Sequence, residues 1–374
     1  MQISYWEQDA MLDADVIVIG GGIIGLQTAL ELRERLPRER IVLLERGLLP
    51  AGASSRNAGF ACFGSLTEIL HDIDAMGADA AVALVERRWR GLQRLRSRLG
   101  DDAMGYEDFG GFELLLEAQT GALRRLDEVN EHLHRLFGQA VFSVDAAGLR
   151  ASGFGREVHA LVKNPLEGQV HSGRMMRALA ALAARHGIEI HTGAQVTALH
   201  DDGARVHVQV ESRRGLAFRA PRVAVCTNGI TGSVLPDCGI VPGRGQVLVT
   251  EPVSGLPWRG TYHFDEGFYY FRNVGERILL GGGRNLDFAG EETAEMALTD
   301  KIQAALEKML YQVIVPGREP RIEHRWAGIM GFAADKQPIV KRVSERVALG
   351  FGCNGMGVAL GADIAAETAA LLND

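Results

Sequence analysis

The feature that constrains this chain most is a glycine-rich turn close to its N-terminus. Residues 20–25 read Gly-Gly-Gly-Ile-Ile-Gly, a G-x-G-x-x-G motif. The motif follows an apolar run over 15–19, which predicts a buried parallel strand, and it opens a stretch with helical apolar spacing over 23–36. A second apolar run covers 41–44. A strand, a helix and a strand within about thirty residues predict one βαβ unit.

The glycines of this motif have separate physical roles in binding a dinucleotide. Gly20 permits the tight turn, Gly22 lets the backbone approach a pyrophosphate, and Gly25 lets the helix and the strand pack closely. The helix that begins near Ile23 and Ile24 presents free N–H groups and partial positive charge to the phosphates. We therefore expect this segment to bind a pyrophosphate.

An acid stands where such a fold needs one. Glu45 ends the second apolar run about 20 residues after Gly25, and Arg46 follows it. A carboxylate at this place accepts hydrogen bonds from ribose hydroxyls and disfavours a 2′-phosphate, so NADP is not expected. The polar segment 53–59, ASSRNAG, follows within one loop. A simple NAD dehydrogenase has no use for it, whereas FAD needs more donors along its longer pyrophosphate and its isoalloxazine, so the segment favours FAD.

The rest of the chain alternates between two kinds of pattern. Helices are predicted over 78–99, 172–186, 292–311 and 357–372, and further strands over 188–191, 206–210 and 222–226. Between 245 and 282, short alternating runs joined by turns predict an antiparallel sheet. After Arg325 we expect two short strands before the last helix.

These patterns, with 374 residues and 47% hydrophobic content, predict two interleaved domains. The expected fold class is α/β. A Rossmann-like FAD-binding domain would be formed by 1–75, 150–235 and 325–374. An α+β substrate-binding domain built on the antiparallel sheet would be formed by 76–149 and 236–324.

The charge and the termini exclude some classes of partner. A formal net charge of −7 gives no global attraction to nucleic acid or to anionic lipid. The arginines between 87 and 98 are interpreted as the solvated face of an amphipathic helix. The N-terminus carries acids where a signal peptide needs Lys or Arg, and the apolar run that starts at Val16 is too short to span a bilayer. A cytoplasmic location is expected.

The cysteines also favour a cytoplasmic location. Cys62, Cys226, Cys238 and Cys353 are scattered without C-x-x-C spacing. They predict neither a disulfide framework nor a metal site, and they suit a reducing compartment.

Taken together, the motifs make the chain resemble the D-amino-acid oxidase, glycine oxidase and sarcosine oxidase family of FAD-dependent oxidoreductases, the DAO family. Six segments carry the resemblance in the family's order: DVIVIGGGIIG at 15–25, LLERG at 43–47, GASSRNAGF at 52–60, VAVCTNG at 223–229, WAGIMGFAADKQPIV at 326–340 and GFGCNGMG at 350–357. The start of the chain, Ser4-Tyr5-Trp6, is similar to that of the γ-glutamylputrescine oxidase-like subgroup.

The resemblance implies which residues hold FAD. In the polar loop, the residues that would line the pyrophosphate and the flavin are Ala53, Ser54, Ser55, Asn57, Ala58 and Gly59. Val196 would meet the adenine through its backbone, and Thr227 and Gly229 lie in the loop after the closing strand. The segment expected at the pyrimidine edge of the flavin, where the last helix begins, comprises Gly352, Cys353, Asn354, Gly355, Met356 and Gly357. Cys353 departs from the family, which usually has glycine there.

The flavin is expected to be non-covalent. Relatives attach FAD to a cysteine just before a D-x-x-P loop, but here that stretch is Met330-Gly331-Phe332, followed by Asp335 to Pro338. Other relatives use a histidine in the 54–59 loop, which has none here. No metal is predicted.

Four residues are candidates for the substrate end of the site: Tyr269, Phe271, Met330 and Asn354. The resemblance places Tyr269 facing the flavin, and strand alternation puts Phe271 on the same face, with Tyr270 and Arg272 opposite. Met330 stands where glycine oxidase has a carboxylate-binding arginine. A substitute could be Arg56, Arg244, Arg272 or Arg284, and the sequence singles out none of them.

The expected activity is oxidation of the C–N bond of a small amine or amino acid. The neutral amine would deliver a hydride from its α-carbon to flavin N5, the imine would hydrolyse, and the electrons would pass to O2 or another acceptor. Two alternatives stay open at this point: oxidation of a 2-hydroxy acid, and a flavin-binding subunit of a larger complex without turnover alone. The substrate, the acceptor and the oligomeric state do not follow from the sequence.

Overall fold

The first sheet of the protein is six-stranded and mostly parallel. The computed structural model describes residues 3–212, 215–236, 238–334 and 337–373. The strands run in the order β18 (Ile339–Arg342), β19 (Val347–Phe351), β12 (Arg222–Val225), β1 (Val16–Ile19), β2 (Ile41–Glu45) and β8 (Glu189–Thr192). Neighbours are parallel except for the edge pair β18–β19. The predicted βαβ unit is therefore confirmed.

Apolar runs form these strands because both faces of the sheet are covered. Val16 and Val18 pack into the core under α1 (Ile23–Arg35), α8 (Ser172–Arg185) and α11 (Gly357–Leu371). Ile17 and Ile19 point to the other face, where a three-stranded sheet packs. That small sheet consists of β9 (Val196–Asp201), β10 (Val206–Val210) and β11 (Ala217–Ala220).

A second sheet has eight strands and is almost entirely antiparallel. Its order is β17 (Ile322–Phe332), β13 (Val241–Thr250), β16 (Arg277–Gly282), β15 (Tyr269–Val274), β14 (Thr261–Phe264), β4 (Gly111–Leu116), β6 (Val158–Asn164) and β5 (Ser143–Val144). Only β14 and β4 pair in parallel. The antiparallel sheet predicted between 245 and 282 is confirmed, and the α/β class with two interleaved units holds.

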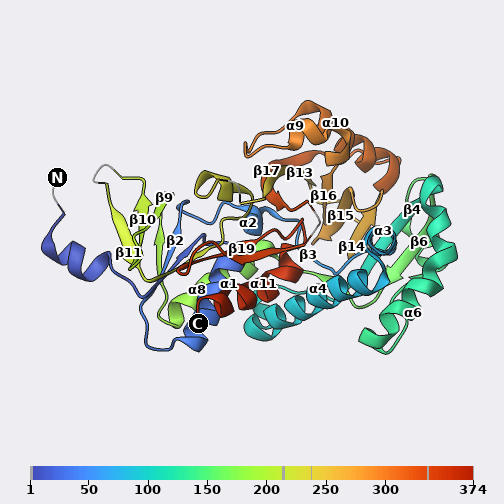
Figure 1. Ribbon diagram of the computed structural model, residues 1–374. Coiled ribbons are helices and arrows are strands. Elements are labelled where there is room, and N and C mark those ends of the chain that lie inside the picture. Colours follow the sequence, from blue (N-terminus) through green and yellow to red (C-terminus); the bar gives the residue numbers. More distant parts are fainter. Residues whose placement is uncertain (1–2, 213–214, 237, 335–336, 374) are drawn as a thin grey trace.

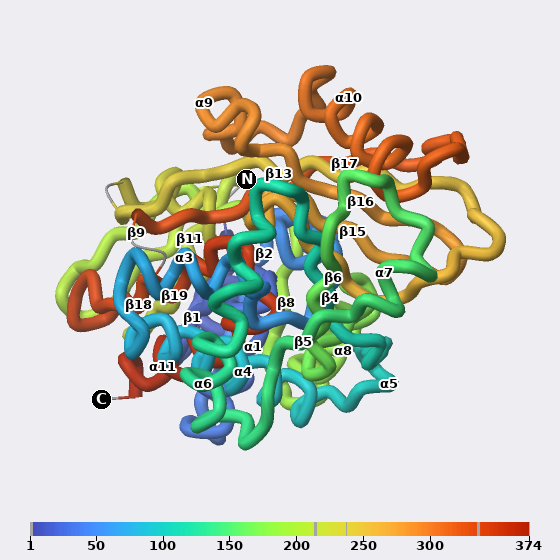
Figure 2. Tube along the Cα trace, turned by 90° about the vertical axis from the view of Figure 1, so that its right-hand side faces the viewer, coloured from blue at the N-terminus to red at the C-terminus, as the bar shows by residue number. Residues whose placement is uncertain are grey.

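The remaining elements surround these sheets. They are α2 (Ala53–Arg56), α3 (Leu66–Met76), α4 (Ala78–Leu99), α5 (Asp101–Met104), α6 (Leu126–Phe137), α7 (Ala146–Ser152), α9 (Phe288–Glu291), α10 (Asp300–Met309), and the small ladder of β3 (Phe60–Ala61) with β7 (Gly168–Gln169). Both views place α9 and α10 at the top of the molecule and α1, α4 and α11 at the bottom (Figures 1 and 2). Among the described residues, no helix is both long and apolar enough to cross a membrane.

One local prediction is wrong. The helix expected over 292–311 begins only at Asp300, because the backbone N–H of Thr299 donates to Oε1 of Gln246 at 3.0 Å and holds the preceding segment against β13. The two short strands expected after Arg325 are present as β18 and β19, before the last helix α11, and the long β17, which pairs with β13, precedes them. The domain ranges stay a proposal. β6 falls within the range 150–235 that was assigned to the FAD-binding domain, but it pairs in the eight-stranded sheet. β17 crosses the boundary set at 325.

The arginine-rich helix α4 is not simply a solvated face. Arg87 and Arg90 form ion pairs with Asp363 of α11 at 2.9 and 2.7 Å. Arg94 and Arg98 both pair with Glu31 of α1. The arginines therefore join α4 to the two helices behind the parallel sheet, a role that the helical pattern of α4 alone could not reveal.

Candidate active site

One large cavity lies between the two sheets. It has a volume of about 730 Å3, within the range of roughly 300–1,000 Å3 of ligand sites. One wall comes from the carboxyl ends of the parallel strands, with Gly20 after β1, Glu45 at the end of β2, and Thr227 after β12. The opposite wall comes from β13, β15 and β17. Ligands bind at this end of open α/β sheets, so the cavity stands where the fold favours a cofactor.

The glycine-rich turn is built as its motif predicts. Gly20 has φ +107°, and a Cβ there would lie 2.7 Å from the backbone oxygen of Cys226. A Cβ at Gly25 would collide with the backbone oxygen of Gly20. Gly25 therefore serves close packing and does not line the cavity, whereas Gly22, Ile23 and Ile24 do.

Glu45 is buried at the mouth of this turn. Its Oε2 accepts a hydrogen bond from the N–H of Gly21 and its Oε1 accepts one from the N–H of Gly47, both at 2.8 Å. A carboxylate has about four lone-pair positions, so further acceptor capacity faces the cavity. Arg46 and Val196 also line the cavity.

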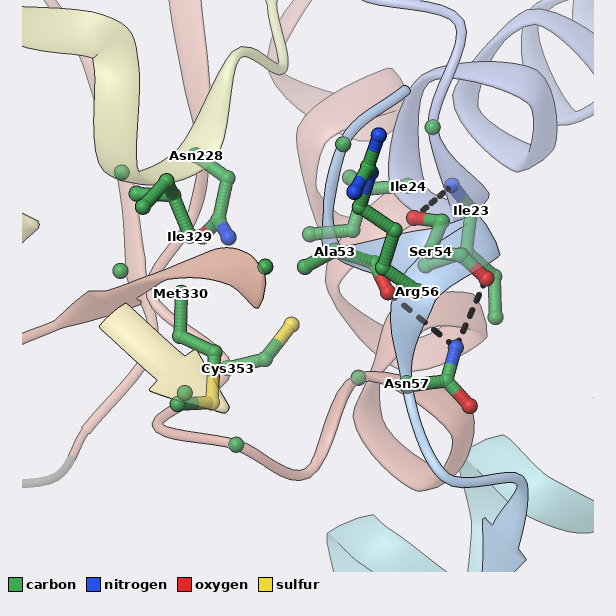
Figure 3. Close-up of a pocket in the computed structure, with 18 of the residues that line it drawn as sticks. Ile23, Ile24, Ala53, Ser54, Arg56, Asn57, Asn228, Ile329, Met330 and Cys353 are labelled. Atoms are coloured by element: carbon green, nitrogen blue, oxygen red, sulfur yellow. Dashed lines mark hydrogen bonds between the residues drawn. The ribbon is translucent and has the colours of Figure 1, made fainter. Parts of the chain in front are cut away.

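The polar loop is fastened to α1 and to itself. Oγ of Ser54 accepts a hydrogen bond from the N–H of Ile23 at 2.8 Å, and Nδ2 of Asn57 donates to the backbone oxygen of Ser54 at 2.7 Å (Figure 3). The loop residues that line the cavity are Ala53, Ser54, Arg56, Asn57, Ala58 and Gly59. Ser55 does not line it, because its hydroxyl donates back to Pro50.

A second helix start faces the cavity from the C-terminal segment. Asn354 adopts the left-handed conformation at φ +48°, and its Oδ1 accepts from the N–H of Ala333 at 2.8 Å. Met356 and Gly357 line the cavity where α11 begins without a side-chain cap, so this helix end presents partial positive charge to a ligand. Cys353 and Gly355 also line the cavity, whereas Gly352 does not.

The loop after β12 was only partly identified from sequence. Thr227 and Gly229 line the cavity as expected. Asn228 between them also lines it, with φ +51°. Left-handed residues other than glycine gather at functional sites, and asparagine adopts this conformation more readily than most residues. The Asn-Gly pair in the VAVCTNG segment is therefore the sequence signal that could have indicated Asn228. Figure 3 shows Asn228, Ile329, Met330 and Cys353 across the cavity from the start of α1 and the polar loop.

The far end of the cavity is aromatic. Its lining there includes Phe60, His263, Phe268, Tyr270, Met330 and Phe332. Phe60 contacts Tyr270 and His263 edge-on, at ring-centroid distances of 5.7 and 4.9 Å. Gly245 of β13 leaves room beside them, since a Cβ there would lie 2.9 Å from Cε of Met330.

The expectation that Tyr269 and Phe271 face the substrate needs correction. Neither lines the cavity. Tyr269 stacks on Phe264 and Phe271 stacks on Tyr262 within a core cluster on the other face of the large sheet. Strand alternation correctly placed Tyr269 and Phe271 on the same face of β15, but it does not identify the face that lines the cavity. Tyr270, on the opposite face, lines the cavity.

The four candidate arginines have different surroundings. Arg244 is paired with Glu291, and Arg272 donates to the backbone oxygens of Gly59 and Val170; neither lines the cavity. Arg56 lines it but donates to the backbone oxygens of Ala51 and Ala327. Arg284 also lines it.

These residues fit FAD. Two helix starts, the glycine turn and Glu45 share one cavity with its aromatic end. We call this end the aromatic chamber; its residues are Phe60, His263, Phe268, Tyr270, Met330 and Phe332. Within the described residues, no group of three or more His, Cys, Asp or Glu side chains could hold a metal ion. The D-x-x-P segment at 335–338 begins outside the described residues.

Comparisons with known proteins identify the family of the chain. The sequence profile of the family described as "FAD dependent oxidoreductase" (DAO) matches residues 15–371. Glycine oxidase of Pseudomonas aeruginosa is 27% identical over 84% of this chain and 82% of its own length. Gamma-glutamylputrescine oxidoreductase of Escherichia coli is 24% identical over 93% of this chain and 80% of its own length.

Solved structures share the fold. Glycine oxidase from Geobacillus kaustophilus superimposes with a TM-score of 0.75 at 21% identity, covering 97% of this chain and 95% of that one. L-proline dehydrogenase from P. horikoshii gives a TM-score of 0.76 at 18% identity, covering 96% of this chain and 93% of that one. With a family match that extends over nearly the whole chain, the protein belongs to the DAO family of FAD-dependent oxidoreductases.

Proposed function

We propose that the protein oxidises the C–N bond of a small amine or amino acid. The observation that carries this proposal is that one cavity joins a dinucleotide cradle, at Gly22 and Glu45, to an aromatic chamber at Tyr270 and Met330. Relatives named for glycine, gamma-glutamylputrescine and L-proline support a substrate with an oxidisable C–N bond.

In this proposal the residues of the chain orient the cofactor and the substrate, and they stabilise negative charge on the cofactor. FAD, when bound, supplies the acceptor for the electron pair that leaves the substrate carbon. The helix starts at Ile23 and Gly357 offer N–H groups to negative charge on the cofactor. Asn354 and Asn228 hold the loop before α11 in place. Nδ2 of Asn354 donates to the backbone oxygen of Gly352, its N–H donates to that of Gly331, and Oδ1 of Asn228 accepts from the N–H of Gly352 at 3.5 Å.

The chamber binds the substrate mainly through apolar contact. Phe60, Phe268 and Tyr270 form an aromatic surface that excludes water and holds a substrate carbon against the cofactor site. Burial lowers the pKa of His263, so its imidazole is neutral at physiological pH and adds no charge to this surface. A neutral amine loses a hydride without an obligate side-chain base, which suits a chamber of this composition.

Anaerobic reduction of the bound flavin is the direct test. The FAD-loaded protein is mixed under nitrogen with primary amines, N-methyl amines, amino acids and 2-hydroxy acids, and the flavin absorbance is followed. We expect bleaching by members of the amine or amino-acid group, followed by return of colour when O2 or another acceptor is added.

Two other outcomes would overturn the proposal. Bleaching by 2-hydroxy acids alone would assign the site to C–O oxidation. No bleaching by any compound, with FAD bound, would mark the chain as a flavin-binding subunit that needs a partner for turnover.

A further inference from the structure

The proposed reaction leaves one proton without an acceptor. An amine in water is mostly an ammonium ion, since an alkyl ammonium group has a pKa of about 10.4, as in lysine. Its hydride can leave only after the nitrogen has lost a proton and regained a lone pair. Of the residues that define the aromatic chamber, His263 is the one with a basic nitrogen. The surroundings of His263 therefore decide where the proton can go.

His263 stands between the chamber and the interior of the protein. The residue lines the cavity but is only 7% exposed, and its Nε2 is buried without a hydrogen-bond partner. The ring of Phe60 contacts it edge-on and fixes its orientation. An imidazole nitrogen left unpaired in the interior is costly, so this ring is poised to bind a further polar group.

A cross-strand row leads from the chamber through His263 to a buried carboxyl. In the register of the large sheet, His263 is paired with Tyr270 of β15 on one side and with Glu113 of β4 on the other. Residues that are paired in this way point to the same face of a sheet, so the three side chains form one row. Tyr270 lines the cavity and Glu113 does not, so the row runs inward.

A small void lies at the inner end of this row. It has a volume of about 10 Å3, close to the size of one water molecule, and its lining includes His263, Ser65, Glu113, Asn164 and Glu167. Nδ2 of Asn164 is buried without a hydrogen-bond partner, as is Nε2 of His263. A single water in such a place has several polar partners and can carry a proton between the ring and Glu113.

Glu113 can take up a proton near neutral pH. Its carboxylate accepts hydrogen bonds from the hydroxyl groups of Ser65 and Thr67 and from the N–H of Thr67, which leaves about one lone-pair position unused. Burial raises its pKa to about 7. Burial in the chamber also lowers the pKa of an ammonium ion, so the two values converge and the transfer costs less than it does in water.

The other ionisable groups around the imidazole do not take its place. Glu68 of α3 raises the pKa of the ring, but burial lowers it by more. Burial raises the pKa of the Cys62 thiol well above its ordinary value, that of Tyr270 to about 12 and that of Glu167 to about 8, so all three hold their protons at pH 7. Arg88 of α4 is turned towards Asp72. The imidazole is therefore the neutral base of this wall.

We infer that His263 accepts the proton of a bound ammonium group and passes it to Glu113, so that the amine is neutral when its hydride leaves. This inference rests on the proposed C–N oxidation. The N–H bond of the substrate breaks, its electron pair stays on the substrate nitrogen, and a new N–H bond forms on the ring. The other ring nitrogen gives its proton to the carboxylate of Glu113. No electron leaves the substrate in this step, and the proton returns through the ring when water refills the chamber.

The first experiment follows the pH dependence of flavin reduction. Pentylamine, norvaline and N-methylalanine represent primary amines, α-amino acids and secondary amines, and they are mixed with the FAD-loaded protein under nitrogen. At about pH 7 we expect His263→Gln to slow reduction by about a hundredfold and Glu113→Gln by about tenfold, because neither amide can bind the proton. At about pH 9.5 both variants should approach the unmodified protein, since more of the amine arrives neutral.

His159→Gln is the matched control. His159 of β6 belongs to the same sheet, but it is exposed and does not line the cavity, so this variant should follow the unmodified protein at every pH. An unchanged rate in His263→Gln at pH 7, with normal FAD content, would overturn the inference. A loss of the same size at both pH values would also overturn it, because it would assign His263 a structural role.

The second experiment does not depend on turnover. tert-Butylamine has no hydrogen on the carbon that carries its nitrogen, so it can bind but cannot deliver a hydride. Infrared difference spectra are recorded at about pH 8, where Glu113 is mostly ionised. Binding of the amine should add the C=O stretching band of a protonated carboxyl, and this band should be missing in Glu113→Gln and in His263→Gln.

The two experiments fail in different ways. Binding of tert-butylamine to the unmodified protein without the carboxyl band would refute the transfer to Glu113. If none of the amines reduces the flavin of the unmodified protein, the proposed function fails, while the infrared band still decides the proton route.

Discussion

The carboxylate of Glu45 accepts a hydrogen bond from the backbone N–H of Gly21 at 2.8 Å, which ties the end of β2 to the turn after β1. The same carboxylate also accepts from the N–H of Gly47. One side chain thus fixes the turn and keeps lone pairs for the cavity. The protein therefore holds the glycine-rich turn in place through its own hydrogen bonds, without any bond from the ribose of a cofactor.

Glu45→Ala should weaken FAD binding by about 1–3 kcal/mol, because charge-assisted hydrogen bonds are lost. Glu45→Gln should lose less, since its amide oxygen can still accept from Gly21 or Gly47. Equilibrium dialysis of FAD against the three proteins measures the difference. Equal affinities would show that the ribose is bound elsewhere.

Replacing two glycines of the motif should separate binding from folding. A valine at Gly22 places branched atoms at the cavity wall, where the pyrophosphate is expected, so FAD binding should be abolished. An alanine at Gly25 would collide with the backbone of Gly20, so that variant should unfold at a lower temperature. Thermal unfolding and FAD content are measured together. Normal FAD content in Gly22→Val would contradict the placement of the pyrophosphate.

The features of this fold that could be predicted from the sequence are those determined by residues close together in the chain. The βαβ unit, the glycine turn and Glu45 follow from short-range periodicity and spacing, and they appear in the structure as expected. The bond between Ser54 and Ile23 joins segments far apart in the chain, and only the family resemblance pointed to Ser54.

Other features depend on tertiary packing that no local pattern contains. Strand alternation grouped Tyr269 with Phe271, but the side of the sheet that faces the cavity was set by α10 and its neighbours covering the other face. The arginines of α4 look like a solvated face until Asp363 and Glu31 are seen opposite them. Among the four candidate arginines, Arg56 and Arg284 could be separated from Arg244 and Arg272 only when the lining of the cavity was known.

FAD should be released intact when the yellow protein is denatured in acid. Three thiols line the cavity, those of Cys62, Cys226 and Cys353, and burial raises the pKa of each. For Cys226 and Cys353 the pKa rises to about 12, so these thiols stay protonated and are poor nucleophiles towards a flavin. The measurement is the flavin absorbance of the supernatant. Flavin that stayed with the precipitate would reveal a covalent bond.

Stability should decline as the pH rises towards 8, because of two buried carboxyls. Burial raises the pKa of Glu167 to about 8 and that of Glu113 to about 7, from an ordinary value of 4.5. The folded protein keeps these protons when the unfolded chain has lost them. The stabilisation is therefore complete below about pH 4.5 and is lost as the pH rises through the folded pKa values.

Glu167→Gln tests this pH dependence. A glutamine keeps an oxygen for the N–H groups of Phe63 and Gly64 but cannot ionise. The free energy of unfolding of each protein is measured by urea titration between about pH 5 and pH 8. The decrease over this range should be smaller by roughly 1–3 kcal/mol in Glu167→Gln than in the unmodified protein. The exposed Glu319→Gln serves as the control and should follow the unmodified protein. Parallel pH profiles for all three would remove Glu167 as the cause.

Glycine should be a poor substrate. Met330 places a thioether at the substrate end of the cavity, where a carboxylate beside it would be left without a partner at a cost of a few kcal/mol. A molecule as small as glycine would also leave the surface of Phe60 and Tyr270 uncovered. A larger or secondary amine gains apolar contact there, and any carboxylate that it carries must reach an arginine elsewhere. Steady-state kinetics with glycine, D-amino acids, N-methyl amino acids and polyamine derivatives should therefore give glycine a low kcat/KM, and a highest value for glycine would refute this account of the chamber.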